Sequence, residues 1–457
     1  MKAVLIATYE LGRQPFGLAS PAAWLREAGV EVTCFDVSRE RLSQDAVRTA
    51  ELIAFYVPMH TATRLAVALL PAVREMNPRA HICFYGLYAP VNEKYLRALG
   101  AETILGGEFE EGLASLASRL AEKPGAPPLG PERAISLARQ NFRVPDRRGF
   151  APLEKYARLM MPGGESRAVG YTEASRGCKH LCRHCPIVPV YDGTFRIVDR
   201  DVVLADVRQQ VAAGAQHITF GDPDFFNGIG HAVPLIEAVH REFPSLTYDA
   251  TIKIEHLLKH SDCLSTLHDT GCLFVTSAVE SVDDDVLRKL AKNHTCADFL
   301  RVIEIFQEIG LMLAPTFVTF TPWTTLESYC ELLALIRERE LIENVAPIQF
   351  AIRLLIPAGS RLMELPDVRG MVGPFDESAL VYPWQHADPR VDALCSGLQE
   401  VVHAGEKMGR WRARIFERIE AEAYAALGRD REPRVSAGGP VLPSRATIPY
   451  LNEPWYC

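Results

Sequence analysis

The chain has 457 residues, 48% of them hydrophobic and 23% charged, and its 49 basic and 57 acidic side chains give a formal net charge of -8. This is the composition of a globular protein long enough for about three domains of roughly 150 residues each. Without a long run of lysine or arginine, nothing in the charge favours nucleic acid or an anionic membrane as a partner. No apolar run approaches the roughly 18 residues of a membrane span, and the N-terminus lacks a signal-peptide cleavage region. We therefore expect a cytoplasmic protein, in which close groups of cysteines are metal or redox sites rather than disulfides.

The first 120 residues alternate short apolar runs with helical patterns. The expected strands are 4–7, 30–35, 52–57, 81–85 and 103–105, and the expected helices are 19–28, 62–76, 91–99 and 110–120. Such βαβ alternation is typical of a doubly wound parallel sheet. Ligands of these sheets bind beyond the carboxyl ends of the strands. The candidate binding residues at those ends are Tyr9, Glu10, Gly12, Met59, Tyr85, Gly86, Gly107 and Glu108.

A segment rich in proline and glycine, residues 122–132, marks a linker. After it, expected strands lie at 168–172, 217–220, 246–251, 273–277, 313–319 and 348–352, with helical patterns between them. Six such units predict a partial or complete α/β barrel. A looser C-terminal region follows, with a basic amphipathic helix expected near residues 410–426. The chain is therefore divided into a Rossmann-like domain (1–121), a linker (122–166), a partial barrel (167–356) and a C-terminal region (357–457).

The sharpest signal for chemistry is a C-x3-C-x2-C loop, Cys178, Cys182 and Cys185, directly after a predicted strand. Three thiolates on so short a loop can converge on soft metal ions, and thiolates favour iron-sulfur clusters or zinc. A zinc site usually has a complete shell of four ligands, often as paired cysteines. No second pair follows at that spacing, although His180 or His184 could complete a zinc site. Three ligands to a four-iron cluster would instead leave one iron open, which implies chemistry at the metal.

This loop resembles the signature of the radical S-adenosylmethionine (SAM) superfamily, in which it follows the first strand of a partial α/β barrel. The resemblance implies that Cys178, Cys182 and Cys185 hold a 4Fe-4S cluster, that SAM chelates the open iron, and that one electron from the cluster breaks a carbon-sulfur bond of SAM. It also implies a small-molecule substrate and an external electron donor such as flavodoxin or ferredoxin. The candidate SAM-binding residues are His184, Gly221, Asp222, Lys253, Ser277, Glu280 and Arg353. The family usually has a larger aromatic residue at the position of His184.

Ordinary structural roles compete for three of these residues. Asp222 could be a turn residue, and Glu280 could be a charge at a helix N-terminus. Arg353, beside the expected sixth strand, could bind a carboxylate in the SAM pocket or merely close a surface ion pair.

The N-terminal domain resembles the cobalamin-binding domain that precedes many radical SAM barrels. The likeness lies in residues 16–19 and 24–32 and in the Gly-Gly-Glu-Phe-Glu-Glu turn at 106–111. Cobalamin is therefore a candidate cofactor, although the D-x-H-x-x-G motif that supplies a histidine ligand to cobalt is absent. The aromatic-rich loop 84–88 replaces small residues and could fill the space that a corrin ring needs.

The last eight residues, 450–457, end on an aromatic pair and Cys457. They resemble a radical SAM family whose tail continues into selenocysteine or cysteine and then Ala-Glu-Pro, so we expect that a selenocysteine codon was read as a stop. A thiol-selenol pair is a soft site that suits trivalent arsenic. The tail family looks related to the radical SAM proteins of arsinothricin biosynthesis, which join the 3-amino-3-carboxypropyl part of SAM to arsenic. A frayed tail without function is the alternative.

Three classes of function follow. The first is a radical SAM transferase in which Cys457 takes part in catalysis by presenting the acceptor. The second is a cobalamin-dependent radical SAM methyltransferase. The third is a zinc- or cluster-binding protein without catalysis.

Overall fold

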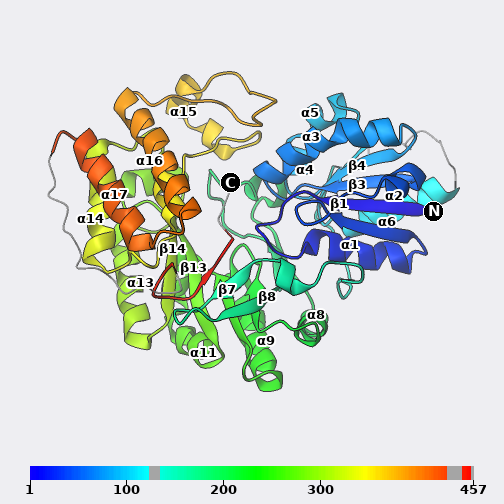
Figure 1. The fold of residues 1–457 in the computed structure, drawn as a ribbon, viewed down its shortest axis with the longest axis horizontal. Coiled ribbons are helices and arrows are strands. Elements are labelled where there is room, and N and C mark those ends of the chain that lie inside the picture. Colours follow the sequence, from blue (N-terminus) through cyan, green and yellow to red (C-terminus); the bar gives the residue numbers. More distant parts are fainter. Residues whose placement is uncertain (123–133, 430–444, 454–457) are drawn as a thin grey trace.

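The computed structural model describes residues 1–122, 134–429 and 445–453, which form an N-terminal α/β domain, a larger barrel-like domain and a helical C-terminal region (Figure 1). This confirms the predicted α/β class, a doubly wound parallel sheet followed by a partial barrel. No helix of the described residues is long and apolar enough to cross a membrane.

The N-terminal sheet has the strand order β2-β1-β3-β4-β5-β6, with all pairs parallel. Its strands are β1 (Lys2–Ala7), β2 (Glu31–Asp36), β3 (Leu52–Tyr56), β4 (His81–Tyr85), β5 (Thr103–Gly107) and β6 (Ile135–Ser136), and its helices are α1 (Phe16–Glu27), α2 (Gln44–Thr49), α3 (His60–Met76), α4 (Tyr88–Val91), α5 (Glu93–Ala98) and α6 (Glu110–Glu122). One core lies between the sheet and α1 and α6, and another lies between the sheet and α2 to α5. Both faces are therefore covered, which explains the continuous apolar runs of the strands.

Two predictions for this domain need correction. The helix expected at 91–99 is two short helices, α4 and α5, with Asn92 between them bonded to the Tyr88 carbonyl (Nδ2 to O 2.9 Å). The expected linker is also partly built into the sheets: β6 is the sixth strand of the N-terminal sheet, and β7 (Arg158–Met160) belongs to the barrel sheet.

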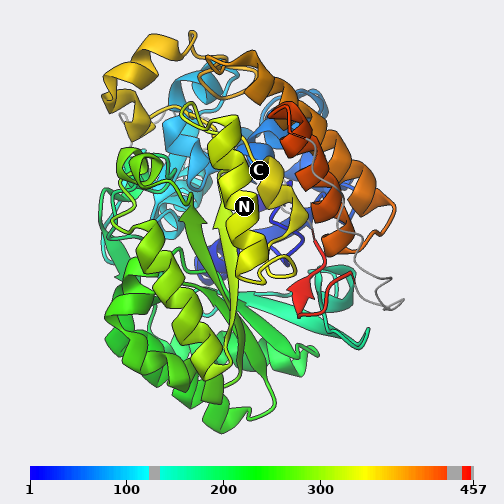
Figure 2. The same cartoon turned by 90° about the vertical axis from the view of Figure 1, so that its left-hand side faces the viewer.

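The barrel sheet has the order β14-β13-β12-β11-β8-β7-β15. Its parallel strands are β8 (Ser166–Thr172), β11 (His217–Phe220), β12 (Thr247–Thr251), β13 (Cys272–Glu280) and β14 (Met312–Phe317), while β7 and β15 (Tyr450–Leu451) are antiparallel at one edge, and β9 (Ser175–Gly177) and β10 (Phe195–Ile197) form a separate ribbon. Figure 2 shows the green strands of this sheet fanning out, with helices along the outside. The carboxyl ends of the five parallel strands meet at one edge, where ligands bind in such folds.

Helices cover the outer face of the barrel sheet. Those that share its core are α8 (Arg200–Ala212), α9 (Ile229–Glu242), α10 (Ile254–Lys259), α11 (Leu264–Asp269), α13 (Cys296–Ile309) and α14 (Leu326–Glu338), with the short η2 (Phe225–Gly228) and η3 (Ser261–Cys263) between them and η1 (Leu153–Lys155) before them. Two further helices lie elsewhere: α7 (Val188–Tyr191) contacts α4 and β5 of the N-terminal domain, and α12 (Asp284–Leu290) packs against the C-terminal region. The C-terminal region adds η5 (Arg361–Glu364), α15 (Pro366–Met371), α16 (Pro389–Lys407) and α17 (Arg412–Ala426). The last two helices share the core of the barrel, and α17 confirms the amphipathic helix expected there.

The sixth barrel strand, expected at 348–352, is wrong. The segment forms a 3-10 helix, η4 (Pro347–Ala351), and only an isolated bridge joins Phe320 to Arg353. Pro347 has no amide hydrogen for a ladder. The Gln349 side chain instead accepts a hydrogen bond from the Phe317 amide of β14 (2.9 Å), so this edge amide has a partner without another strand.

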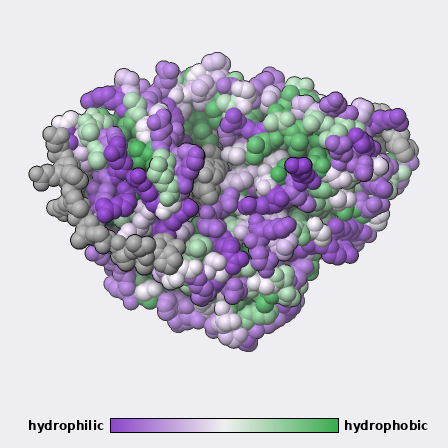
Figure 3. All heavy atoms as spheres, in the orientation of Figure 1, coloured by the Kyte–Doolittle hydropathy of each residue, from purple (hydrophilic) through white to green (hydrophobic). Residues whose placement is uncertain are grey.

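The described end of the chain bridges the two domains. β15 pairs with β7, and Glu453 then forms an ion pair with Arg39 of the N-terminal domain (Nη2 to Oε2 3.3 Å). Elsewhere on the surface, hydrophobic side chains gather over α3 and α4 (Figure 3), and α3 includes Leu65, which is 46% exposed.

Candidate active site

The three predicted cluster ligands lie on the loop after β9. Gly177 begins this loop with φ +72°, and a Cβ there would lie 2.5 Å from the Thr194 carbonyl oxygen, so only glycine fits. The Cys185 amide donates to the Cys182 carbonyl (3.2 Å). The loop is therefore folded into a tight turn that keeps the cysteines together.

The three thiols lie near enough to one another for Cys182 and Cys178 to affect the pKa of Cys185. Burial raises the pKa of Cys185 to about 12, and the neighbouring Cys182 and Cys178 raise it further. Burial also raises the pKa of Cys178. Without a metal these groups stay protonated, and a bound metal would deprotonate them. Three thiols in one buried place form a donor set that fits a cluster with three protein ligands.

A buried ion cluster lies beside the thiols. Glu280 is hydrogen-bonded to His184 (Nε2 to Oε1 3.1 Å) and paired with Lys292 (Nζ to Oε1 3.2 Å). Burial alone would raise the pKa of Glu280, but Lys292 and His184 lower it to about 2. Glu280 also has φ +69°, which is unusual for a residue with a side chain and is typical of functional sites. Asp283 caps the helix that follows, so Glu280 is not its N-terminal charge.

Lys292 was not predicted from the sequence. Its side chain is only 4% exposed, and Cys182 and Cys185 both interact with its charge. A cation beside thiolates stabilises their ionised form. The signal that could have found it is a lysine shortly after Glu280, since a buried carboxylate needs a buried cation.

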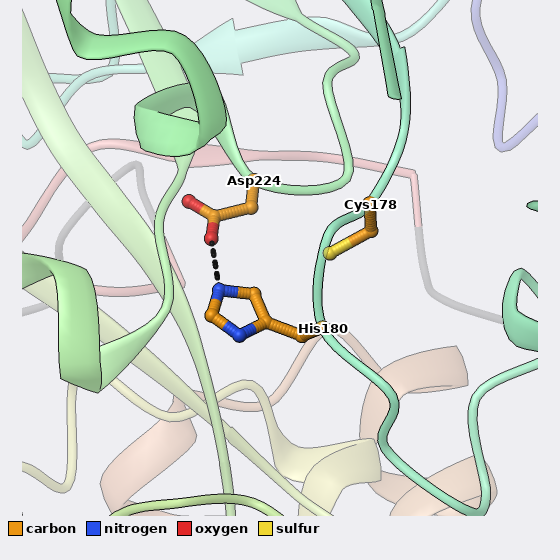
Figure 4. Close-up of side chains that lie close together, drawn as sticks. All are labelled: Cys178, His180 and Asp224. Carbon is orange, nitrogen blue, oxygen red and sulfur yellow. Dashed lines mark ion pairs between the residues drawn. The ribbon is translucent and has the colours of Figure 1, made fainter. Parts of the chain in front are cut away.

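Cys178 also lies beside a second polar group (Figure 4). The donor atoms of Cys178, His180 and Asp224 lie within 4.8 Å of one another. Asp224 lies at ion-pair distance from His180 (Nε2 to Oδ2 3.3 Å) and from His256 (Nδ1 to Oδ2 2.6 Å). Burial would raise the pKa of Asp224, but these two histidines lower it to about 2. This triad is another arrangement that could hold zinc, besides the three cysteines completed by a histidine, and it offers three of the four ligands that a structural zinc site needs.

Gly221 and Asp222 follow β11 and line a cavity of about 690 Å³. A Cβ at Gly221 would lie 1.8 Å from the Tyr171 hydroxyl oxygen, so only glycine fits there. Asp222 accepts hydrogen bonds from the Ser175 hydroxyl (2.5 Å) and the Ala174 amide (2.9 Å). Burial raises the pKa of Asp222 to about 7. Asp222 thus joins β11 to the segment that leads into the cysteine loop, as a turn residue and as a carboxylate on the cavity.

The other predicted SAM contacts differ in their surroundings. Lys253 is buried and paired with Glu255 (Nζ to Oε2 3.2 Å). Ser277 is fully buried, and its hydroxyl has no hydrogen-bond partner among the described residues. Arg353 is bonded to Asp392 (2.5 Å) and stacks on the ring of Trp384 (3.6 Å), and it does not line the cavity. Arg353 thus closes an ion pair with the C-terminal region, one of the two roles expected for it, and its contact with SAM stays a prediction.

Aromatic rings fill the carboxyl edge of the N-terminal sheet. The ring centroids of Tyr56 and Tyr85 are 5.3 Å apart, and Phe109 lies 5.0 Å from Tyr85. Tyr85 is fully buried, with its hydroxyl bonded to the Gly17 carbonyl (2.9 Å). Gly86, at φ +109°, packs against Tyr56.

The cavity between this edge and the cysteine loop is about 200 Å³. Even drug-sized ligands need roughly 300–1,000 Å³, and a corrin ring with its substituents is larger still. As these side chains are arranged, they do not fit cobalamin.

The remaining predicted residues of this edge have structural surroundings. Gly12 has φ +70° and lies against Glu453, and Met59 precedes α3 and packs on the core of the domain. Tyr9 is half-buried. The backbone of Gly107, at φ +69°, approaches the Ser136 carbonyl so closely that a Cβ would lie 2.2 Å from its oxygen. Cys457 lies outside the described residues.

Arg176 joins the two domains through buried carboxylates. It pairs with Glu110 (Nη1 to Oε1 2.6 Å), Glu173 (Nε to Oε2 2.8 Å) and, more loosely, Glu108 (Nη1 to Oε2 3.5 Å). Burial raises the pKa of Glu108 to about 7, against the opposing charge of Arg176. One Glu108 oxygen has no hydrogen-bond partner among the described residues. Arg176 and Glu173, which precede the cysteine loop, are thus held in one ion network with Glu108 and Glu110 of the turn at 106–111.

The raised pKa of Glu108 predicts a pH-dependent stability. The pKa of Glu108 is higher in the folded chain than the usual 4.5, so folding favours the protonated carboxyl. The contribution of Glu108 to folding stability is therefore fully present below pH 4.5 and is lost as pH rises through about 7. Glu108→Gln should therefore gain about 2 kcal/mol over the wild type near pH 8 and little near pH 5. Urea unfolding at both pH values measures this difference, and an equal effect of the substitution at both would contradict it.

Comparison with known proteins agrees with this geometry. Residues 172–336 match the model of the radical SAM superfamily. Among curated proteins, the chain is 23% identical over 325 residues to the hopanoid C-3 methylase of Methylococcus capsulatus, covering 68% of this chain and 62% of that protein. It is 26% identical over 208 residues to the ribosomal protein uS12 methylthiotransferase RimO of Syntrophotalea carbinolica, covering 43% of this chain and 45% of that protein. The matches thus span less than two thirds of each of these relatives.

Among solved structures, the cobalamin-dependent SAM radical enzyme OxsB, with aqua-cobalamin and SAM bound, aligns with a TM-score of 0.72 at 13% identity, covering 93% of this chain and 71% of that one. The radical SAM methyltransferase TsrM from Kitasatospora setae, with tryptophan and a SAM analogue bound, aligns with a TM-score of 0.63 at 17% identity, covering 80% and 76%. Residues 172–336 therefore match a radical SAM domain. Its whole fold, a cobalamin-domain-like sheet joined to a partial barrel, is the fold of OxsB and TsrM.

Proposed function

We propose that the chain is a radical SAM transferase that cleaves SAM reductively and transfers a SAM-derived group to a small-molecule acceptor. The observation that carries this proposal is the grouping of three largely buried thiols on one loop, two of which, Cys182 and Cys185, interact with the charge of Lys292. Cys178, Cys182 and Cys185 would hold a 4Fe-4S cluster and leave one iron without a protein ligand. Such a cluster, when bound, would supply the electron that breaks a carbon-sulfur bond of SAM.

The chain's own residues would bind and orient a cationic cosubstrate. SAM carries a sulfonium and an ammonium group, and a buried cation needs a carboxylate partner. Glu280 is ionised at neutral pH because its pKa is about 2, and Asp222 would ionise fully once a cation lies beside it. Lys292 would offset the charge of the thiolates, which makes the loop a better cluster site.

The cavity of about 690 Å³ supports an organic acceptor beside SAM. It reaches Gly221 and Asp222 on one side, and Phe274 and Met312 contribute apolar walls. Its size is within the roughly 300–1,000 Å³ of small-molecule sites. Apolar walls exclude water, which protects reactive species during the reaction.

The finer hypotheses remain predictions. Transfer of the 3-amino-3-carboxypropyl group to trivalent arsenic, and a selenocysteine after Cys457, depend on the tail resemblance alone, because Cys457 lies outside the described residues. A flavodoxin or ferredoxin as the electron donor is likewise a prediction from the resemblance.

Cobalamin-dependent methyl transfer is the second candidate. The likeness of fold to OxsB and TsrM, over 93% and 80% of the chain, favours it. The rings of Tyr56, Tyr85 and Phe109 oppose it, because they fill the edge of the sheet at which a cobalamin would bind.

The products of SAM distinguish these functions. We expect anaerobically purified protein, reduced with dithionite and given SAM and candidate acceptors with arsenite first, to convert SAM to 5′-deoxyadenosine or 5′-methylthioadenosine, as measured by mass spectrometry. The first product indicates adenosyl-radical chemistry, and the second indicates aminocarboxypropyl transfer. S-adenosylhomocysteine together with a corrin absorbance would indicate the methyltransferase instead. Iron-loaded protein that leaves SAM intact would contradict the proposal.

A further inference from the structure

The loop after β1 lies at the point where ligands bind in doubly wound sheets. The order β2-β1-β3 places the topological switch between β1 and β3, and ligands bind beyond the strand ends at such a switch. Leu11 (φ +51°) and Gly12 (φ +70°) are both left-handed, which is rare for leucine and is found at ligand contacts and active sites. The Ala157 amide donates to the Gly12 carbonyl (2.8 Å), so the loop is fixed to the segment before β7. Leu11 and Arg13 therefore line the cavity of about 690 Å³.

Arg13 has no anionic partner in the described part of the chain. Its guanidinium lies over the ring of Tyr171 (4.8 Å), its buried Nε has no acceptor, and none of the described carboxylates forms an ion pair with it. Burial raises the pKa of the neighbouring Glu10 well above its usual value although the charge of Arg13 opposes this, and no ion pair joins the two side chains. Glu453 lies against Gly12 but pairs with Arg39. A cation held on an apolar cavity without a counter-ion is costly unless a ligand supplies one.

The rest of the cavity indicates what kind of molecule carries that counter-ion. Its walls include Phe274, Met312 and Leu451, while Gly221 and Asp222 join it to the predicted SAM residues. Arginine presents a planar fork that matches a carboxylate or another oxyanion with two parallel hydrogen bonds.

We propose that the acceptor substrate is an organic anion, most simply a carboxylate with an apolar body, and that Arg13 binds its anionic group. This inference rests on the proposed function for the identity of the site. It adds the substrate class and a specificity-determining residue contributed by the N-terminal domain, which thereby forms one wall of the substrate site.

A second basic group on the cavity, contributed by the C-terminal region, provides the control. Lys407, Arg410 and Arg445 line the cavity together with Glu406, while Arg412 is bonded to the Glu343 carbonyl and stacks on Tyr450. Arg410 is exposed and lines the same cavity as Arg13, so Arg410→Gln removes an equal charge from another element of the cavity wall.

Two dyes that differ by one anionic group test the proposal. The full chain is titrated with 8-anilinonaphthalene-1-sulfonate and with its uncharged analogue N-phenyl-1-naphthylamine, and emission is measured. We expect Arg13→Gln to lower the affinity for the sulfonate dye about 10- to 100-fold, which is the effect of losing one charged hydrogen-bonded pair. The affinity for the neutral dye should change no more than about twofold. Arg13→Lys should lose part of this affinity, and Arg410→Gln should change either dye no more than about twofold.

Each other outcome overturns the proposal. Equal weakening of both dyes would mean that Arg13 only shapes the cavity, and a larger effect of Arg410→Gln would mean that the anion binds to the basic group of the C-terminal region instead. Wild-type protein that binds neither dye, or a sulfonate affinity that Arg13→Gln leaves unchanged, would also overturn it. Dye binding does not depend on a cluster or on SAM cleavage. Iron content and SAM products of the same wild-type preparation therefore show separately whether the proposed function fails.

Discussion

Cys185→Ser should abolish both the cluster and SAM cleavage. Iron should fall from about four atoms per chain to almost none, because a four-iron cluster held by two thiolates is not retained. Cys185 is the informative choice, since it lies outside the Cys178, His180 and Asp224 triad, which could hold zinc without it. Metal analysis and mass spectrometry of SAM products measure the two losses.

Controls for this prediction lie on the same domain. Cys263 is a partly exposed cysteine on η3, and Cys263→Ser should keep full iron and activity. Asp224→Asn should leave iron bound if the thiols alone are ligands. Zinc retained by Cys185→Ser and lost by Asp224→Asn would refute the cluster and support the zinc alternative.

Lys292→Met should destabilise the protein by about 3–5 kcal/mol, because it leaves the buried Glu280 carboxylate without its cation. Replacing both partners, as Glu280→Gln with Lys292→Met, should restore most of that loss, since no buried charge is then left unpaired. Urea unfolding of the metal-free protein measures both variants. A double variant as unstable as the single one would show that Lys292 acts through packing and not through its charge.

Lys289 offers a matched comparison. It lies three residues earlier, and its pair with Asp367 (Nζ to Oδ2 2.5 Å) is about one third exposed on the lysine side. Exposed pairs contribute about 1 kcal/mol or less, so Lys289→Met should cost far less than Lys292→Met.

The sequence predicted those parts of the site that are contiguous. Cys178, Cys182 and Cys185 are ligands on one loop, so their spacing alone indicates the chemistry. Lys292, His256 and Arg176 were missed because each acquires its role from partners on other elements. The sequence around a lysine or arginine does not show that it will be buried, because its acidic partner comes from another element of the fold.

The errors in the fold have similar causes. An apolar run such as 348–352 is compatible with either a strand or a helix, and the Pro347 that begins η4 was the signal against a strand. β6 has only two residues, which is too short for an alternating pattern. Its place in the N-terminal sheet follows from its pairing with β5 (Gly106 with Ile135).

The position of β6 matters for expressing the two domains as separate fragments. A fragment that stops at residue 121 would lack β6 and leave the edge of β5 open, and open edges recruit other chains into aggregates. The same cut would remove Arg176, the ion-pair partner of Glu108 and Glu110, and would leave these two buried carboxylates without a cation. Expressing the halves as separate modules should therefore yield insoluble material, whereas co-expression of the pieces offers a route to a soluble assembly.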